Sequence, residues 1–416
     1  MKPKISFSEE QKDWIRRPLL SNIEKILDYR GRTPKKLGLS WSDTGYLALS
    51  ALNVKNGYID FNVDANYGNQ DLYERWMGNN NLHKGQVVFT TEAPMGNVAQ
   101  IPNDDLYILS QRTIAFEVKH DLIREDFLAT LLRSQKVFNE LTSLSSGGTA
   151  KGVSQKSLSN LKICLPTSLE EQSAIGSLFR TLDDLLVSYK DNLTNYQSLK
   201  ATMLSKMFPK AGQTVPEIRL DRFEGEWEVQ SLKELASFSK GNGYTKSDLV
   251  NSGNEIILYG QLYTNYQTVI SMVNTFVLET REKSIISKGG EVVVPASGES
   301  AEDISRASVI EKSGVIIGGD LNIIYPDENK VDSIFLALTI SNGSQQKELI
   351  KRAQGKSVVH LRNNDLEKVV LHYPSMEEQR AIGTYFSNLD NLINSHQEKI
   401  SQLETLKKKL LQDMFI

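Results

Sequence analysis

The sequence predicts an α+β fold made of two tandem, mixed α/β domains, each followed by one long helix. Two observations support this prediction. A block of residues recurs 207 positions later in the chain, and each copy opens a segment with apolar residues at every seventh position. The chain has 416 residues, which is enough for two to four domains of roughly 100–200 residues each. We expect the two helices to pair as an antiparallel coiled coil and to give the molecule pseudo-twofold symmetry.

The repeat is the strongest signal in the sequence. Glu170–Gly176 reads EEQSAIG, and Glu377–Gly383 reads EEQRAIG. Near the start of each half, a second set of anchors recurs at a slightly different offset: Pro3, Ile5 and Trp14 match Pro216, Ile218 and Trp227. A period of this length is too long for a solenoid repeat and indicates two tandem domains that share one frame.

Each repeated block is predicted to begin a helix with a heptad seam of about five heptads. The positions seven apart are Ile175, Leu182, Tyr189, Tyr196 and Met203 in the first copy, and Ile382, Leu389, Leu403 and Leu410 in the second. The expected companion positions are Leu178, Leu185 and Leu199, and Tyr385, Leu392 and Leu406. Each helix would be roughly 55 Å long at 1.5 Å per residue. Polar residues expected in the seam, Asn192, His396 and Lys399, are interpreted as register control.

The frame predicts five segments in order. They are a first domain over residues 1–160, a helix within 161–208, a Pro-containing linker at 209–215, a second domain over 216–368 and a helix within 369–416. Short apolar runs predict paired strands near 85–89 and 290–294, and near 114–118 and 321–325. The segments 126–132 and 333–338 are expected to start helices.

Composition excludes several classes of protein. The hydrophobic share is 39% and the net charge is −3, from 48 basic and 51 acidic side chains, so neither a disordered tail nor a small basic nucleic-acid module is indicated. No apolar run of about 18 residues exists, and the N-terminus lacks an apolar signal region. The single cysteine, Cys164, cannot form an internal disulfide. We therefore expect a cytoplasmic location.

The sequence lacks the common motifs of catalysis and cofactor binding. Gln354–Ser357 resembles the end of a phosphate-binding loop, but Ile350 stands where its first glycine belongs. We find no motif for a metal, a dinucleotide or a methyl donor, and expect no metal and no cofactor in this chain. A weak nuclease alternative remains, because Asp104 followed by Glu117 and Lys119 could hold a divalent metal.

Basic segments at corresponding places in the two halves are candidates for nucleic-acid contacts. Residues 12–36 hold eight basic and three acidic side chains, and phosphate contact is one interpretation of such clustering. An ordinary solvated charge run is the alternative. The candidate residues are Arg30, Arg32, Lys35 and Lys36 in the first half, and Lys240, Tyr244 and Lys246 in the second.

Two glycine-bearing turns and two polar loops complete the candidate interface. Glycine lets backbone amides approach an anion, and a nearby hydroxyl and lysine favour phosphate binding. The turns contribute Thr149 and Lys151 in one half and Lys356 and Ser357 in the other, with a simple turn as the alternative. Divergent loops after matched strands, where recognition would differ, contribute Thr90, Thr91 and Ser297.

With these motifs in place, the chain resembles the specificity (S) subunit of a Type I restriction-modification system. The segment 216–228, PEIRLDRFEGEWE, is similar to the usual opening of a repeat in that family. The segments from Pro166 and Pro374 resemble the starts of its conserved helices, and 290–304 resembles a common target-recognition domain. The first opening differs, because Lys4–Phe7 replaces the Glu-Ile-Arg-Leu of the second.

The resemblance implies two target-recognition domains, each reading half of a bipartite DNA site, with helices that set the gap and bind two methylation subunits. S-adenosylmethionine, and ATP with Mg²⁺ where restriction occurs, would belong to partner subunits, including any restriction subunits. The alternative function is a coiled-coil scaffold that pairs two protein ligands. For partner docking we expect an outer helix stripe with Phe179, Leu186, Phe386 and Ile393, and packing against the chain's own domains is the alternative.

Overall fold

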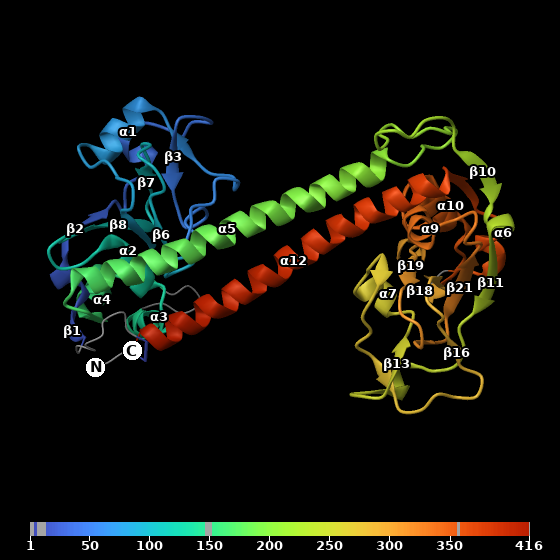
Figure 1. The fold of residues 1–416 in the computed structure, drawn as a ribbon. Helices are drawn as coiled ribbons and strands as arrows, with labels where there is room; N and C mark the ends of the chain where they lie inside the picture. Colours follow the sequence, from blue (N-terminus) through green and yellow to red (C-terminus); the bar gives the residue numbers. More distant parts are fainter. Residues whose placement is uncertain (1–3, 6–13, 146–151, 356–357, 416) are drawn as a thin grey trace. The chain divides into compact units, whose positions relative to one another are not determined.

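The computed structural model describes residues 4–5, 14–145, 152–355 and 358–415, and the chain divides into two compact units (Figure 1). Unit 1 comprises Met1–Lys190 and Glu398–Ile416, and unit 2 comprises Asp191–Gln397. Each unit therefore combines one globular part with a portion of both long helices. In the described part of the chain, no helix is both long and apolar enough to cross a membrane.

Unit 1 is built on an antiparallel four-stranded sheet in the order β2-β8-β5-β6. Its strands are β2 (Ile23–Asp28), β8 (Thr113–Val118), β5 (Val87–Thr90) and β6 (Val98–Gln100). A second sheet, in the order β4-β3-β7, consists of Tyr67–Gly68, Tyr46–Leu49 and Ile108–Leu109. A two-stranded sheet pairs β1 (Ile15–Pro18) with β9 (Lys162–Leu165). The helices are α1 (Gln70–Met77), α2 (Glu125–Leu132), α3 (Gln135–Leu144) and α4 (Gln155–Asn160).

Unit 2 repeats this plan with a five-stranded sheet in the order β11-β21-β17-β19-β14. These strands are Ala236–Lys240, Leu321–Pro326, Glu291–Pro295, Ser308–Ile310 and Val269–Ile270. The second sheet, β12-β15-β13-β20-β16, consists of Leu249–Val250, Phe276–Val277, Asn254–Ile257, Ile316–Ile317 and Ile285–Ile286. Two pairs complete it: β10 (Glu228–Ser231) with β23 (Val370–Tyr373), and β18 (Ser297–Gly298) with β22 (Val359–His360). The helices are α6 (Leu232–Leu235), α7 (Gln261–Thr264), α8 (Ala301–Ile304), α9 (Ser333–Ile340), α10 (Gly343–Arg352) and α11 (Asn363–Leu366).

The central strand of each main sheet is buried on both faces, which explains its continuous apolar sequence. In β5, Val87 and Phe89 belong to one core cluster, while Val88 belongs to another. In the equivalent strand β17, Val292 faces one cluster and Val293 the other. These strands, and the helices that begin near 126 and 333, confirm the predicted mixed α/β domains.

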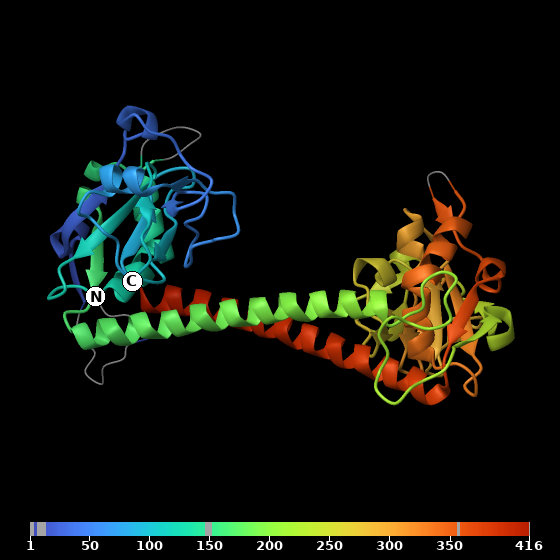
Figure 2. The ribbon, with the colours of Figure 1, turned by 90° about the horizontal axis from the view of Figure 1, so that it is seen from above.

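The two long helices, α5 (Leu169–Lys206) and α12 (Met376–Met414), run antiparallel within each unit (Figures 1 and 2). In unit 1, Lys190 pairs with Glu404 at 2.7 Å between Nζ and Oε1, and Asp183 pairs with Lys407. Rising residue numbers on α5 thus meet falling numbers on α12. Unit 2 shows the same direction, because Tyr196 stacks edge-on with His396 and Lys200 pairs with Asp390. The antiparallel prediction is confirmed.

The heptad seam follows a different second position from the one predicted. The seam of α5 is a row of at least partly buried side chains that continues just past the end of the helix: Ile175, Phe179, Leu182, Leu186, Tyr189, Leu193, Tyr196, Lys200, Met203 and Met207. They alternate in steps of four and three, and their counterparts 207 residues later form the α12 seam. The predicted first positions are correct. The leucines expected as companions at 185, 199, 392 and 406 are instead exposed, and so are Asn192 and Lys399.

The repeated glutamine of each block fastens a long helix to its domain. Gln172 is buried, donates through Nε2 to the carbonyl of Leu122 at 3.1 Å, and accepts from the amide of Arg124 at 2.9 Å. Gln379 makes the matching bonds to the carbonyl of Lys330 and the amide of Asp332, both at 2.9 Å. A buried amide costs free energy unless it is hydrogen-bonded, and in both repeats these bonds satisfy the glutamine side chain.

The repeated tryptophans, Trp14 and Trp227, each pack in the core of one unit against an aromatic residue at the end of a long helix. Trp14 lies 5.9 Å, ring centre to ring centre, from both Phe127 and Phe415. In unit 2, Trp227 lies 5.7 Å from Phe335 and 6.3 Å from Phe208. The two halves of the repeat therefore use the same packing to complete their cores.

Candidate nucleic-acid interface

Among the described candidates of unit 1, Arg30, Thr90 and Thr91 lie at one edge of the main sheet, where β2 and β5 end and β8 begins. The register pairs Asp28 with Ile114 and Thr90 with Thr113, so these strand ends lie side by side. A segment that precedes α4 joins this edge, because the amide of Val153 donates to the carbonyl of Thr91 at 2.9 Å. Residues far apart in sequence thus form one surface.

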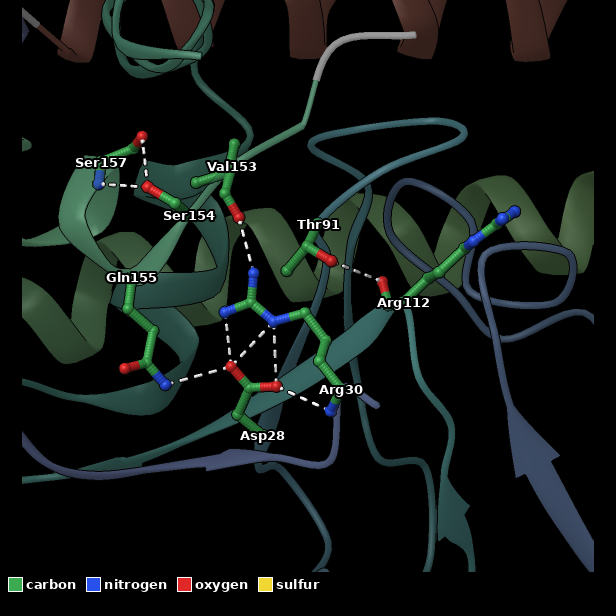
Figure 3. Close-up of polar contacts among 8 residues, drawn as sticks. All are labelled: Asp28, Arg30, Thr91, Arg112, Val153, Ser154, Gln155 and Ser157. Atoms are coloured by element: carbon green, nitrogen blue, oxygen red, sulfur yellow. Dashed lines mark hydrogen bonds and ion pairs between the residues drawn. The ribbon is translucent and has the colours of Figure 1, made fainter. Parts of the chain in front are cut away.

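Arg30 lies at the centre of this edge and is engaged by Asp28 (Figure 3). Its Nε donates to the Asp28 carboxylate at 2.9 and 3.0 Å, and its Nη1 donates to the carbonyl of Val153 at 3.1 Å. Gln155 adds a bond from Nε2 to Asp28 at 3.1 Å. Burial alone would raise the pKa of Asp28, but the hydrogen bonds from Arg30 hold that pKa below its usual value. The same carboxylate raises the pKa of Arg30.

The other predicted cations of this segment are exposed and differ in their surroundings. Arg32 stacks over the ring of Tyr29 at 4.6 Å and donates to the carbonyl of Trp76. The Nζ of Lys36 donates to the carbonyl of Gly31 at 2.7 Å. Lys35 forms no ion pair with any residue that the structure describes. The structure keeps Arg32, Lys35 and Lys36 near the surface, and their DNA contact stays a prediction.

The loop threonines lie below this surface. Thr90 is buried, donates its hydroxyl to the carbonyl of Pro94 at 2.6 Å and accepts from the amide of Asn97 at 2.9 Å. Thr91 is also buried and donates to the carbonyl of Arg112 at 3.2 Å (Figure 3). Both hydroxyls are hydrogen-bonded within the domain, and these bonds favour a role for the two threonines in holding the shape of the loop.

The equivalent edge of unit 2 carries different side chains. Lys240 ends β11 opposite Asn322, is exposed, and occupies the register position that Asp28 has in unit 1. Lys246 is exposed in the following turn. Tyr244 is buried: its ring packs 4.3 Å beneath the Arg281 guanidinium, and its hydroxyl accepts from the Arg281 amide at 2.7 Å. Tyr244 thus positions a cation that the sequence did not indicate.

Ser297 occupies the place in unit 2 that Glu92 has in unit 1. It pairs with His360 in the short sheet β18-β22 and is mostly buried. Next to it, the amide of Leu361 donates to the carbonyl of Ala296 at 3.0 Å, which matches the Val153–Thr91 bond. The remaining predicted phosphate contacts, Thr149, Lys151, Lys356 and Ser357, lie outside the residues that the structure describes.

The proposed partner stripe is placed inside the protein. Phe179 and Leu186 belong to the core of unit 1, and Phe386 belongs to the core of unit 2. Ile393 is also buried. The structure therefore favours the alternative, in which these four side chains pack within the chain itself. They are the true second positions of the heptad seam.

Arg112 is the main candidate that the sequence analysis missed. Its side chain is 57% exposed, forms a 3.2 Å ion pair with Glu92, and extends away from the Asp28–Arg30 pair (Figure 3). It ends the turn that leads into β8, so only the register of the sheet brings it to the edge. No sequence motif marks it. Within the described ranges, no group of three or more His, Cys, Asp or Glu side chains could hold a metal ion.

Comparisons with known proteins agree with this architecture. The family model described as the Type I restriction modification DNA specificity domain matches residues 20–196 and 224–405. Two Methanocaldococcus jannaschii proteins are similar. The MjaVIII specificity subunit is 24% identical over 73% of this chain and 72% of its own length. The putative MjaX specificity subunit is 22% identical over 98% and 94%. The fold matches the crystal structure of the S subunit of a Type-I restriction-modification system from M. genitalium, with a TM-score of 0.66, 16% identity, and coverage of 100% of this chain and 99% of that one.

Proposed function

The chain belongs to the Type I restriction-modification DNA specificity family, and from this premise we propose that each unit reads one half of a bipartite DNA target. The observation that carries the proposal is that each unit has an equivalent sheet edge. The same strand ends meet in both units, but the side chains displayed there differ. A shared frame with different contact residues is what two half-sites of different sequence require. The family match gives no support to a scaffold that only pairs proteins.

We assign direct DNA contact at the edge of unit 1 to the exposed cations. Arg112 is the strongest candidate, because its guanidinium is exposed and its ion pair with Glu92 is itself at the surface. An exposed ion pair contributes about 0–1 kcal/mol, so exchanging Glu92 for a base edge or a phosphate costs little. In unit 2, Lys240 and Lys246 occupy the corresponding surface.

The long helices are proposed to set the gap between half-sites and to bind partner subunits. α5 has 38 residues and α12 has 39, or roughly 57 Å each at 1.5 Å per residue. We propose two methylation subunits as partners, with S-adenosylmethionine bound to them. This chain then supplies recognition and no catalytic group. Any restriction subunits would bring ATP and Mg²⁺.

Exposed leucines on the helices mark a docking position in each unit. Their exposed fractions are 41% for Leu185, 45% for Leu406, 39% for Leu199 and 41% for Leu392. The first two flank the seam at the same heptad position in unit 1, and the last two do so in unit 2. Because the helices are antiparallel, equivalent flanking positions lie on one side of the pair, as the Lys190–Glu404 ion pair shows for the opposite side. Each unit thus offers a matching leucine pair to an identical partner.

Exchange of one domain tests modular recognition. Replacing residues 228–365 with the corresponding segment of another family member should change one half of the methylated motif and leave the other half unchanged. The reason is that these residues include the edge of unit 2 but none of the edge of unit 1. Methylation-sensitive sequencing of the host genome gives the motif directly. A change in both halves, or in neither, contradicts the proposal.

Charge substitution tests the docking position. Leu185→Asp combined with Leu406→Asp should remove one of the two methylation subunits from the complex. A carboxylate buried without a partner in an apolar interface costs about 3–5 kcal/mol, or more than a hundredfold in affinity. Ser188→Asp with Gln402→Asp is the matched control, because both residues are exposed elsewhere on the same helices. Mass measurement of the assembled complex reports the number of bound methylation subunits. A complex that still holds two methylation subunits per copy of this chain would refute the assignment.

A further inference from the structure

Arg30 differs from the other cations of the interface because its guanidinium is already hydrogen-bonded within the protein, mainly to Asp28. The Asp28 carboxylate is 9% exposed and the Arg30 side chain 33% exposed. Asp28 accepts hydrogen bonds from the Arg30 amide at 3.0 Å, from its guanidinium and from Gln155. A guanidinium binds phosphate or guanine through two parallel N–H groups. In Arg30, Nε and Nη2 face Asp28 and Nη1 faces a backbone carbonyl.

These bonds connect two segments that no strand pairing joins. Asp28 ends β2 and Arg30 follows it, whereas Val153 precedes α4 and Gln155 is its first residue. Ser154 caps α4 by accepting from the amide of Ser157 at 3.0 Å (Figure 3). The pair therefore fixes the start of α4, and it holds Val153 beside Thr91 at the edge of the sheet.

We propose that Asp28 and Arg30 are positioning residues for the half-site read by unit 1 and that Arg30 makes no DNA contact. This inference rests on the proposed function and adds to it a residue that holds the interface in shape. Ordinary clustering of basic residues would assign Arg30 to phosphate, and the geometry assigns it to Asp28 instead.

Unit 2 holds the equivalent segments together without charges. Asn363 donates through Nδ2 to the carbonyl of Ser239 at 2.9 Å, and Asn322 donates through Nδ2 to the carbonyl of Leu361 at 2.9 Å. These bonds join the end of β11 and the start of β21 to the segment around α11. The same connection is thus made by neutral amides in one unit and by an ion pair in the other, so unit 2 serves as an internal reference.

The Asp28→Asn variant distinguishes positioning from contact by the sign of its effect. If Arg30 contacted phosphate, removing the neighbouring carboxylate would release the guanidinium and strengthen DNA binding. If Asp28 and Arg30 instead form a positioning pair, Asp28→Asn should weaken DNA binding about tenfold, because hydrogen bonds to charged groups contribute about 1.5–3 kcal/mol. Arg30→Gln should weaken binding similarly and leave the slope of log K against log salt unchanged. A phosphate contact would lower that slope by about 0.9.

The measurement uses the complex with its methylation subunits and three duplexes: the full target, one with a scrambled unit 1 half-site and one with a scrambled unit 2 half-site. The variants should lose affinity for the full target and for the duplex with a scrambled unit 2 half-site, but not for the duplex with a scrambled unit 1 half-site. Asp71→Asn is the matched control, because Asp71 forms an exposed ion pair with Arg75 on α1 of the same unit. It should change nothing.

Gln155→Met is a second variant that keeps every charge and removes only the bond to Asp28. It should weaken unit 1 binding severalfold, and it covers the case in which Asp28→Asn lowers the stability of the domain. Stronger binding by Asp28→Asn, a reduced salt slope for Arg30→Gln, or unchanged binding by all three variants would overturn the inference. Absence of sequence-specific binding by the unaltered complex would instead contradict the proposed function.

Discussion

Phe415→Ala should lower the free energy of unfolding of unit 1 by about 3–5 kcal/mol, the usual range for a buried phenylalanine. The Phe415 ring is buried among Trp14, Phe127 and Phe179, with ring centres 5.9, 5.9 and 6.2 Å away. Truncation removes three aromatic contacts and leaves a cavity where the ends of the repeat meet. Hydrogen exchange of the α2 amides measures the loss, because this helix packs in the same core.

Phe208→Ala is the matched variant in unit 2. Phe208 lies 5.8 Å from Phe335 and 6.2 Å from Phe386, ring centre to ring centre. It should expose the amides of α9 and leave those of α2 protected. Phe61→Ala, which removes an exposed ring from unit 1, should leave both helices protected. Equal loss of protection in both units after Phe415→Ala would contradict the division of the cores.

The second large effect is expected at Asp183, which joins three elements of unit 1. Its carboxylate contacts Lys407 of α12 and the guanidinium of Arg133, which follows α2 and is 6% exposed. Asp183→Asn leaves two largely buried cations facing each other, at a cost of about 3 kcal/mol. Burial already lowers the pKa of Lys407, and the attraction of Asp183 opposes that shift. Chemical denaturation of the variant measures the destabilisation.

A double-mutant cycle separates charge from packing at this site. Adding Lys407→Met to Asp183→Asn should recover part of the lost stability, because one unpaired cation disappears. The counterpart in unit 2, Asp390→Asn, should cost less, since Asp390 pairs with Lys200 and no arginine among the described residues joins the pair. Asp184→Asn, at the exposed neighbouring position, is the control. Strictly additive effects of the two substitutions would show that the charges are not coupled.

The repeat made the fold predictable, but the face of each helix was harder to assign. A heptad seam has two apolar positions in every seven residues. When only one of them is known, the second can lie three or four residues later, because both spacings keep the seven-residue period. Leu185 and Leu186 are adjacent and equally apolar, so periodicity alone cannot choose between them. The lysines at 200 and 407 concealed the true companion row, because their charges are satisfied by aspartates from the facing helix.

The sequence indicated candidate residues for the interface but not the contacts that each side chain makes. The structure places Arg30 just after β2 and Lys240 at the end of β11, so these two candidates lie at corresponding sheet edges, and their DNA contact stays a prediction. The sequence could not show that Arg30 is engaged by a carboxylate two residues away, because the same sequence permits an exposed arginine. Nor could it place Arg112 beside Thr91, since that proximity depends on the register of two antiparallel strands.

The aromatic closure of unit 1 has a consequence for folding during synthesis. Domains usually fold in the order in which the ribosome makes them. Unit 2 needs only residues from 191 to 397, so all of its core exists before residue 398 is added. Unit 1 lacks Leu403, Met414 and Phe415 until after that point. The half that is translated first is therefore the last to be completed, because its core waits for Leu403, Met414 and Phe415.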